Sequence, residues 1–549
     1  MENPLFTKAL RYYEAGNLDK AAPLFASCRT QFPQEPGPAN FLGLIALQRG
    51  EVPEAAKAFE EGLRLDPKNA EMWNNYGLAL LAWKKGPLAE RCFRTALELA
   101  PRLEPAQFNL TRALLAQSRF AETVAGLAPL AARYGSDPGA EVEYRFLLGT
   151  ALYRLGRLDE AEPELARATQ LRPDLVEALN NYGACLRSQG RIDEAIAVFE
   201  KALARKPDHA ETHINRATVR LLQGDFAEGW KEFEWRFRSY RLLWEIDSNA
   251  PRWLGEPFPG QTLLLLAEQG LGDTLQFIRY ARQVKERGGE GCSVVIECQP
   301  EVARVLRGVP GLDRVILRGM PRPPFAYYAP LLSLPGIFSP TLDAIPAEVP
   351  YLASTDDAAG KEKREDGPLR VGIVWAGSAA HVEDRSRSCP VEALVPLTRV
   401  EGVEFVGLQK FEPGKGGNYP FPNAVAECRD FLDTARVVAG LDLVISVDTS
   451  VAHLAGGMGK PLWLLLPCHA EWRWLLDRET SPWYPTARLF RQPRPGDWEG
   501  LAERLAGELA ILAEEKKERR EGRAIGAGPA AALISEGGVA TVHHGTPGP

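Results

Sequence analysis

This sequence has no long apolar run, no paired cysteines and no excess of basic charge, and each of these absences argues against a class of protein. No apolar run approaches the roughly 18 residues of a membrane-spanning helix. The longest runs, TLLLLA (262–267) and PLWLLLP (461–467), have the length of buried strands. The eight cysteines are scattered without a C-x-x-C pair, which disfavours a disulfide framework or a zinc module. Basic charge is not in excess, with 65 Lys and Arg against 72 Asp and Glu, so nucleic-acid binding is disfavoured.

The N-terminal residues, MENPLFTKALRYYEAG, contain acidic and polar side chains where a secretory signal needs a basic start and an apolar core. Together with the scattered, reduced cysteines, this pattern predicts a soluble cytoplasmic protein. The length of 549 residues corresponds to about three to four domains.

Residues 1–240 contain an internal repeat of 34 residues. In each unit, small residues would let two antiparallel helices approach, glycines would turn the chain after the first helix, and prolines would stop the second helix. The stretch 104–140 keeps the helical spacing but loses most of these markers. The recurring positions include Pro33, Pro67 and Pro101; Phe25, Phe59 and Phe93; Gly149 and Gly183; and Gly156, Gly190 and Gly224.

These positions resemble the tetratricopeptide repeat, with about seven units over residues 2–236. Such units bury a continuous core only by stacking, and the stack presents a concave groove. The groove is expected to dock a protein or peptide; the alternative is a scaffold that holds or dimerises the next domain. The last unit, GDFAEGWKEFEWRF (224–237), is rich in aromatic residues, which we expect to pack on the neighbouring domain rather than to stack on a ligand.

From residue 260 onward, short apolar runs alternate with amphipathic helices. The expected strands lie at 262–268, 293–299, 314–318 and 325–334, and then at 369–377, 404–410, 442–448 and 461–467. Such alternation predicts parallel sheets with helices on both faces. We therefore expect two Rossmann-like halves, 250–353 and 368–512, separated by a charged linker (354–368). The Gly/Ala/Pro-rich tail, 524–549, is expected to be disordered.

Ligands in parallel sheets bind beyond the carboxyl ends of the strands, and three loops occupy such positions. The first runs from Glu268 to Thr274. Its glycines, including Gly272, would allow a ligand to approach the backbone, and the start of the following helix favours an anion. Asp273 would serve either as a catalytic carboxylate or as a helix cap, and its position leaves both interpretations open.

The second loop begins at Asp448, at the end of DLVISVD (442–448). The hydroxyls of Thr449 and Ser450, together with the N–H groups of a helix start, can hold a diphosphate. His453 lies one turn into this helix, either facing the same cleft or buried as a core histidine.

The third loop follows LRVGIVWAG (369–377) and contains Ser378, Arg385 and Arg387. Its cations would suit a nucleotide diphosphate, although a solvated surface turn has the same composition. Gln409 and Lys410, at the end of EFVGLQK (404–410), are expected to line the same wall.

Four ordered motifs together resemble glycosyltransferase family nine, the lipopolysaccharide heptosyltransferases: LAEQGLGDTLQFIRYA, VGIVWAGSAAHVEDRSRS, FVGLQK and DLVISVDTSVAHLAGGMGKPLWLLLP. The resemblance covers about 250–500. It implies the glycosyltransferase B fold, an α/β fold of two Rossmann-like halves, here following the α-solenoid of repeats, with a final helix that crosses back onto the first half. It also implies inverting, metal-independent transfer from a nucleotide-diphosphate sugar, without a cofactor.

By this resemblance, Asp273 is the catalytic base that deprotonates the acceptor hydroxyl. Thr449, Ser450 and His453 match the loop that holds the donor diphosphate. The family commonly has a lysine on the third loop, where this chain has the serine and the two arginines named above.

The lipopolysaccharide enzymes lack the repeats, so we expect a protein or peptide acceptor that the repeats recruit; transfer onto a surface glycan or a lipid is the alternative. A bacterial subgroup fuses tetratricopeptide repeats to such a domain, and a homo-oligomer is compatible with this arrangement. The alternative function is a non-catalytic scaffold with a degenerate nucleotide-sugar-binding domain.

Overall fold

A computed structural model describes residues 4–134, 139–239, 249–339, 341–353, 367–378, 384–411 and 419–521. The predicted disordered tail, 524–549, and residues 354–366 of the predicted linker lie outside these ranges. The chain divides into two compact units, Met1–Pro207 and Asp208–Pro549. Among the helices of the described ranges, none combines the length and apolar character that crossing a bilayer requires.

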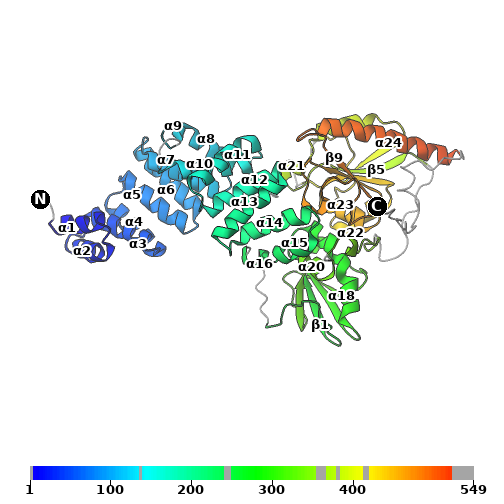
Figure 1. The fold of residues 1–549 in the computed structure, drawn as a ribbon, viewed down its shortest axis with the longest axis horizontal. Helices are drawn as coiled ribbons and strands as arrows, with labels where there is room; N and C mark the ends of the chain where they lie inside the picture. The colour runs from blue at the N-terminus through cyan, green and yellow to red at the C-terminus, as the bar shows by residue number, and fades with distance from the viewer. Residues whose placement is uncertain are drawn as a thin grey trace, which may run out of the picture. The chain divides into compact units, whose positions relative to one another are not determined.

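The first unit consists of antiparallel helix pairs that follow one another along a stack (Figure 1). Each pair corresponds to one predicted 34-residue repeat. The region 104–140, which lost most repeat markers, forms α7 and a shorter α8 that continues into η1 and α9. The helices are α1 (Pro4–Glu14), α2 (Leu18–Gln31), α3 (Pro36–Gln48), α4 (Val52–Leu65), α5 (Ala70–Ala82), α6 (Gly86–Leu99), α7 (Glu104–Ala116), α8 (Phe120–Leu127), η1 (Ala128–Leu130), α9 (Ala131–Tyr134), α10 (Glu141–Arg154), α11 (Leu158–Leu171), α12 (Val176–Ser188) and α13 (Ile192–Arg205).

The recurring glycines have the two roles that the sequence predicted. Gly156 and Gly190 have φ of 76° and 77°, a left-handed turn that residues with a side chain rarely adopt. Gly183 instead lies where α12 meets α13, and a Cβ there would stand 2.6 Å from a ring carbon of the fully buried Phe199. A helix pair can therefore pack this closely only because the first helix carries no side chain at that position.

We predict that Gly183→Ala destabilises the protein by about 1–3 kcal/mol, because the added methyl group overpacks against Phe199. Gly507→Ala is the matched control. Gly507 lies in a helix with no neighbouring atom within 4 Å of a Cβ, so alanine should stabilise by about 0.5–1 kcal/mol. Urea unfolding of both variants tests this prediction, and equal effects in the two variants would contradict it.

The last helix pair of the repeat pattern belongs to the second unit. It comprises α14 (Ala210–Leu222) and α15 (Phe226–Phe233), followed by α16 (Arg236–Ser239). Trp230 packs edge-on against Phe277 and Trp472, with ring centroids 6.2 and 5.0 Å away. The aromatic residues of the last repeat thus pack on the α/β part of the chain.

Arg236 of α16 forms a fully buried ion pair with Glu268, which follows the first strand. Its Nε and Nη2 donate to the two carboxylate oxygens at 2.9 and 3.0 Å. Nη2 also donates to Ser333 Oγ at 2.7 Å, and Glu268 accepts the N–H of Leu332 at 2.9 Å. This network attaches the end of the repeats to the loop that precedes Asp273.

We predict that Arg236→Met destabilises the second unit by about 3–5 kcal/mol, because it leaves the buried Glu268 carboxylate without its cation. The double variant with Glu268→Met should recover most of this loss, since no uncompensated charge then remains. A double-mutant cycle in urea measures both effects. If the double variant is as unstable as the single one, the charge is not the cause.

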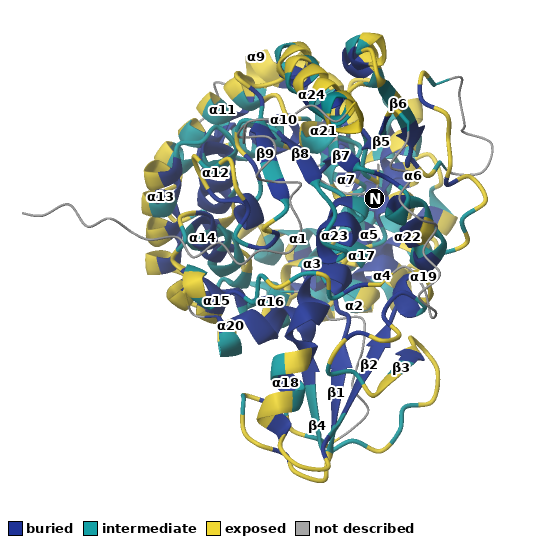
Figure 2. Cartoon of the chain, turned by 90° about the vertical axis from the view of Figure 1, so that its right-hand side faces the viewer, coloured by how far each residue is buried: buried dark blue, intermediate teal, exposed yellow. Residues whose placement is uncertain are grey.

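The remainder of the second unit contains two parallel sheets, with strand orders β3-β2-β1-β4 and β6-β5-β7-β8-β9. Parallel strands with helical crossovers are buried on both faces, and Figure 2 draws β1 and β8 as buried. The strands are β1 (Thr262–Leu266), β2 (Ser293–Cys298), β3 (Arg314–Leu317), β4 (Tyr327–Pro330), β5 (Leu369–Val374), β6 (Val403–Gly407), β7 (Leu443–Val447), β8 (Leu462–Leu466) and β9 (Ala487–Arg491).

The helices of these two sheets are mostly short. They are α17 (Leu271–Phe277), η2 (Ile278–Tyr280), α18 (Ala281–Gly288), α19 (Pro300–Ala303), η3 (Leu331–Ser333), α20 (Leu334–Phe338), η4 (Leu342–Ala344), α21 (Asp384–Arg387), η5 (Val391–Arg399), α22 (Phe431–Ala439), α23 (Ser450–Gly457), η6 (Trp472–Trp474) and α24 (Trp498–Arg520). The predicted strand at 325–334 is shorter than expected, because Leu331 begins a 3-10 turn, and β9 was not predicted.

The expectation that the final helix crosses back onto the first half is wrong for the described residues. In Figure 1, α24 runs along the second sheet, and its core contacts are with η5 and β5. Its apolar stripe of Leu501, Leu505, Leu509 and Leu512 is buried in the core of the second sheet. Because one stripe faces one core along the helix, no apolar face remains for the first sheet.

Candidate functional site

The predicted first and second loops meet in the structure. α17 begins after β1 and α23 begins after β7, and the two helices pack on each other. A Cβ at Gly272 would lie 2.8 Å from His453 Cδ2 and 3.5 Å from Ser450 Cα. The missing side chain at Gly272 therefore permits the contact between the carboxyl ends of the two sheets.

Both carboxylate oxygens of Asp273 have partners. Oδ2 accepts the N–H of Gly270 at 2.8 Å, which caps the start of α17. Oδ1 pairs with the guanidinium of Arg473, and the Asp273 side chain is 17% exposed. The structure thus supports the helix-cap interpretation for one oxygen and gives the other oxygen a charged partner from the second sheet.

Arg473 reaches the first sheet from η6, in the loop after β8. Its Nε donates to Gln276 Oε1 at 2.7 Å, and its other nitrogens bind the carboxylates of Asp273 and Glu471. The guanidinium also lies over the ring of Trp472, 4.3 Å from its centroid. Burial alone would lower the pKa of Arg473, but attraction to Glu471 and Asp273 raises it, so the arginine stays charged.

Asp448 and His453 lie next to this arginine. Trp474 Nε1 donates to Asp448 at 2.9 Å, and Tyr484 Oη lies 2.9 Å from His453 Nδ1. Burial, followed by the charges of Arg473, Arg279 and Arg387, holds the pKa of His453 well below its usual range, so the ring is neutral. His453 is 5% exposed, which corresponds to the core histidine that the sequence left as the alternative.

The hydroxyls of the second loop have different environments. Thr449 Oγ1 lies 3.0 Å from Ser446 Oγ, so this hydroxyl is paired with a residue of β7. Ser450 is the first residue of α23 and is half-buried. The start of α23 therefore offers N–H groups and one half-exposed hydroxyl next to Asp273.

Three acidic groups, Asp273, Asp448 and Glu471, act on the charge of Arg473. Burial raises the pKa of Asp448, and burial raises the pKa of Glu471 to about 7 even though Arg473 attracts its charged form. Glu471 thus changes charge near neutral pH while it stays bound to Arg473. A carboxyl group with such a pKa is able to take up or release a proton in this pH range.

Arg279, beyond α17, makes a second connection between the sheets. Its side chain is buried and donates to the carbonyl of Trp483 at 2.5 Å and to Tyr351 Oη at 2.9 Å. The guanidinium lies over the ring of Tyr484, 4.6 Å from its centroid. This arginine fixes the aromatic residue that holds His453.

The predicted third loop is bound mainly to itself. Arg387 Nε donates to Asp384 at 3.3 Å, and Ser388 Oγ donates to the same carboxylate at 3.1 Å. Ser378 is exposed, and the side chain of Arg385 lies outside the described residues. Arg387 acts on the site through its charge, which opposes the burial that raises the pKa of Asp448 and adds to the burial that lowers the pKa of His453.

Gln409 and Lys410 are used locally. Gln409 Oε1 accepts the N–H of Ala376 at 3.1 Å, which holds the loop after β5 against the loop after β6. Lys410 Nζ donates to the carbonyl of Cys428 at 2.9 Å. Within the described ranges, neither side chain forms a hydrogen bond or an ion pair with the residues around Asp273.

Sequence reasoning missed Glu471, Arg473 and Tyr484. A signal was available for the first two, because HAEWRW (469–474) follows the carboxyl end of β8, the position already used to select the other loops. The alternation of Glu471, Trp472, Arg473 and Trp474 is also unusual in a surface turn. Nothing in the local pattern marks Tyr484.

A tetratricopeptide-repeat family model matches residues 6–70, 42–104, 108–176, 146–210 and 185–232. The N-terminal part of the chain is a tetratricopeptide-repeat array. The matched windows confirm the predicted repeats, including the degenerate region. They end at residue 232, before the two parallel sheets.

Related proteins extend over different parts of the chain. Protein FlbA of Caulobacter vibrioides is 27% identical over 514 residues, 86% of this chain and 84% of that protein. A CTR9 homologue of Arabidopsis thaliana is 30% identical over 144 residues, 26% of this chain and 13% of that protein. The crystal structure of YrrB, a tetratricopeptide-repeat protein with an unusual peptide-binding site, is 21% identical and covers 35% of this chain and 97% of its own, with a TM-score of 0.29.

We predict that Glu471→Gln makes the protein less sensitive to alkaline pH. The folded protein holds a proton on Glu471 up to about pH 7, against 4.5 for a free glutamate, so its stability falls as the pH rises through this window. Between pH 5 and pH 8, the free energy of unfolding should fall less in the variant than in the unmodified protein, by up to about 3 kcal/mol. Urea unfolding at these two pH values measures the difference.

Glu503→Gln, at an exposed position of α24, is the control for this experiment. It should follow the pH dependence of the unmodified protein. If Glu471→Gln follows it as well, Glu471 does not titrate near neutrality.

Proposed function

We propose that this protein is a glycosyltransferase of the glycosyltransferase B fold, which transfers a sugar from a nucleotide-diphosphate donor to a polypeptide recruited by the repeats. The observation that carries the proposal is the meeting of Asp273, from the first sheet, with Arg473 and the start of α23, from the second sheet. A carboxylate, a cation and a helix start are the groups that sugar transfer from a diphosphate requires.

In the proposed reaction, the acceptor hydroxyl gives its proton to the Asp273 carboxylate while its oxygen attacks the anomeric carbon. The bond between that carbon and the diphosphate oxygen breaks, and the nucleoside diphosphate leaves with the electron pair. Attack opposite to the leaving group inverts the anomeric configuration. The N–H groups of Ser450 and Val451, at the start of α23, would bind the departing diphosphate.

We assign Arg473 the role that a lysine of the third loop has in the resembling family. Arg473 is charged, reaches Asp273 and acts on Asp448 and His453. In the absence of donor it holds Asp273, and a carboxylate so paired is a weak base. A bound diphosphate would compete for the guanidinium and thereby release Asp273 to accept a proton.

The repeat array supports a second function, a scaffold for protein assembly without catalysis. Tetratricopeptide repeats bind proteins or peptides through their stacked surface, and they account for the whole of the family match. The capped and paired state of Asp273 also fits a purely structural residue. The two functions differ in whether the α/β part binds a nucleotide diphosphate.

Our prediction for the donor site is that one of ADP, UDP, GDP or CDP raises the unfolding temperature of the full chain. Saturation at 100 times the dissociation constant corresponds to about 2.7 kcal/mol of added stability. The corresponding nucleotide sugar, radiolabelled in the sugar, is then added with the purified chain to an extract that lacks this protein. Radiolabel should be transferred to protein of the extract. Asp273→Asn should lower this transfer by about 100-fold to 10,000-fold and leave the thermal shift in place.

Asp193→Asn, an exposed carboxylate of α13, is the matched control and should transfer normally. If no nucleotide shifts the unfolding temperature and no sugar is transferred, the scaffold function stands instead. Transfer that survives Asp273→Asn would assign the base to another residue.

A further inference from the structure

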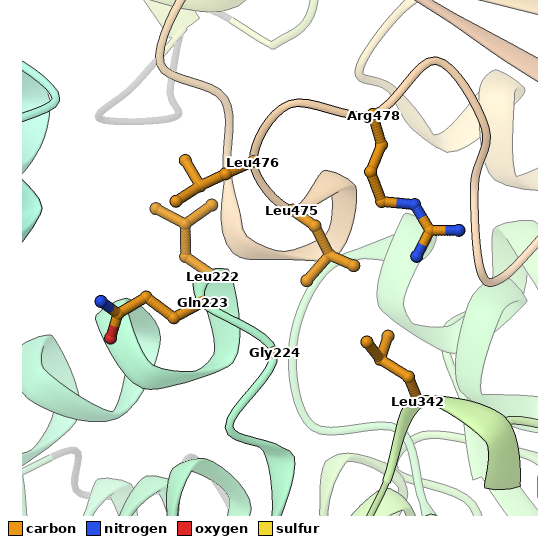
Figure 3. Close-up of a pocket in the computed structure, with 7 residues that line it drawn as sticks. All are labelled: Leu222, Gln223, Gly224, Leu342, Leu475, Leu476 and Arg478. Carbon is orange, nitrogen blue, oxygen red and sulfur yellow. The ribbon is translucent and has the colours of Figure 1, made fainter. Parts of the chain in front are cut away.

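A small cavity lies beside the candidate site, within the second unit (Figure 3). Its volume is about 400 Å³, in the lower range for sites that hold a small molecule or a few side chains. Its walls come from the turn between α14 and α15, from η4 and from the loop after η6. The lining residues are Leu222, Gln223, Gly224, Leu342, Leu475, Leu476 and Arg478.

The lining of the cavity combines four leucines with the polar side chains of Gln223 and Arg478. Four of its residues are leucines, and Figure 3 shows their side chains gathered around the opening with Arg478 at one end. Leu476 is 36% exposed, so its side chain is accessible to a ligand from solvent. The Arg478 guanidinium has one hydrogen bond, to Thr480 Oγ1 at 3.4 Å, and within the described ranges no carboxylate pairs with it.

The loop that forms this wall is held in an uncommon conformation. Leu475 and Asp477 have φ of 54° and 46°, in the left-handed region that residues other than glycine seldom occupy. Arg491 Nη2 donates to the carbonyls of Trp474 and Leu475 at 2.7 and 2.6 Å and keeps the loop in place. Such conformations persist where the surrounding structure enforces them, which occurs often at ligand sites.

The cavity lies close to the candidate base. Leu475 is two residues from Arg473, so their Cα atoms are at most about 7 Å apart. The side chain of Arg473 in turn binds Asp273. An extended peptide advances about 3.3 Å per residue, so a few residues would extend from the cavity to Asp273.

We propose that this cavity anchors the acceptor polypeptide through an apolar side chain followed by an acidic residue. The leucines would enclose the apolar side chain, and Arg478, which has no carboxylate of its own, would bind the acidic one. The proposal rests on the proposed function, because it takes the occupant to be the acceptor. It deepens that function by naming the side chains through which the acceptor would be recognised beside Asp273.

The test measures direct binding, which requires neither donor nor transfer. The probe is the fluorescein-labelled synthetic peptide Gly-Ser-Leu-Leu-Asp-Asp-Ser-Gly, titrated with the full chain and followed by fluorescence anisotropy. We expect saturable binding that is lost when serine replaces both leucines of the peptide, or lysine both aspartates. Arg478→Glu and Leu476→Asp should each weaken binding by about tenfold or more, because one reverses the charge and the other removes the apolar wall.

Leu254→Asp is the matched control, since Leu254 is 64% exposed elsewhere in the same unit. It should bind the peptide as the unmodified chain does. Equal binding by the chain and both cavity variants, or no binding of the peptide up to about 1 mM, would overturn the inference.

Failure of the proposed function gives a different result. Peptide binding that depends on Arg478 and Leu476, in a chain that binds no nucleotide diphosphate, would keep the cavity as a peptide site and reject glycosyl transfer. Nucleotide binding without peptide binding would reject only the anchoring site.

Discussion

The candidate site depends on the ion pairs and the hydrogen bond that the buried guanidinium of Arg473 forms. It binds Asp273 and Gln276 of the first sheet and Glu471 of its own loop. A charge with so little exposure is stable only when its donors are satisfied, and here three side chains satisfy them. Because two of these partners, Asp273 and Gln276, belong to the first sheet's side, this requirement also fixes how the two sheets meet. Burial raises the pKa of both Glu471 and Asp448, and the neighbouring Arg473 opposes that shift.

The close contact of α17 and α23 is the second constraint. Gly272 brings the start of one helix against His453 of the other, and the buried histidine is kept neutral. The last repeat contributes from outside the sheets. Trp230 packs against the residues that flank Asp273 and Arg473, and Arg236 neutralises Glu268. The end of the repeat array is thereby a structural component of the α/β unit, so repeat pattern and packing unit do not end at the same residue.

Much of the architecture could be predicted from periodicity. A 34-residue spacing of glycine, phenylalanine and proline specifies helix pairs because each marker acts within its own unit. Most strands were also predicted, since a continuous apolar run such as 462–466 has few other structures open to it. β9 was missed because ARLFR (487–491) contains two arginines. The crossing of the final helix was expected from a resemblance, whereas the single apolar stripe of α24 follows from the core beneath it.

The sequence by itself determined the repeats, the two parallel sheets and the loops at the carboxyl ends of β1 and β7, because these depend on local spacing and on the direction of parallel strands. Tertiary structure alone decided which side chains have partners. Asp273 and Arg473 are 200 residues apart, and no local pattern relates them. It also placed His453 in the core and directed Gln409 and Lys410 to local carbonyl and N–H groups. A charged side chain pairs with the groups that the fold brings near it, and these groups come together only when the two sheets pack.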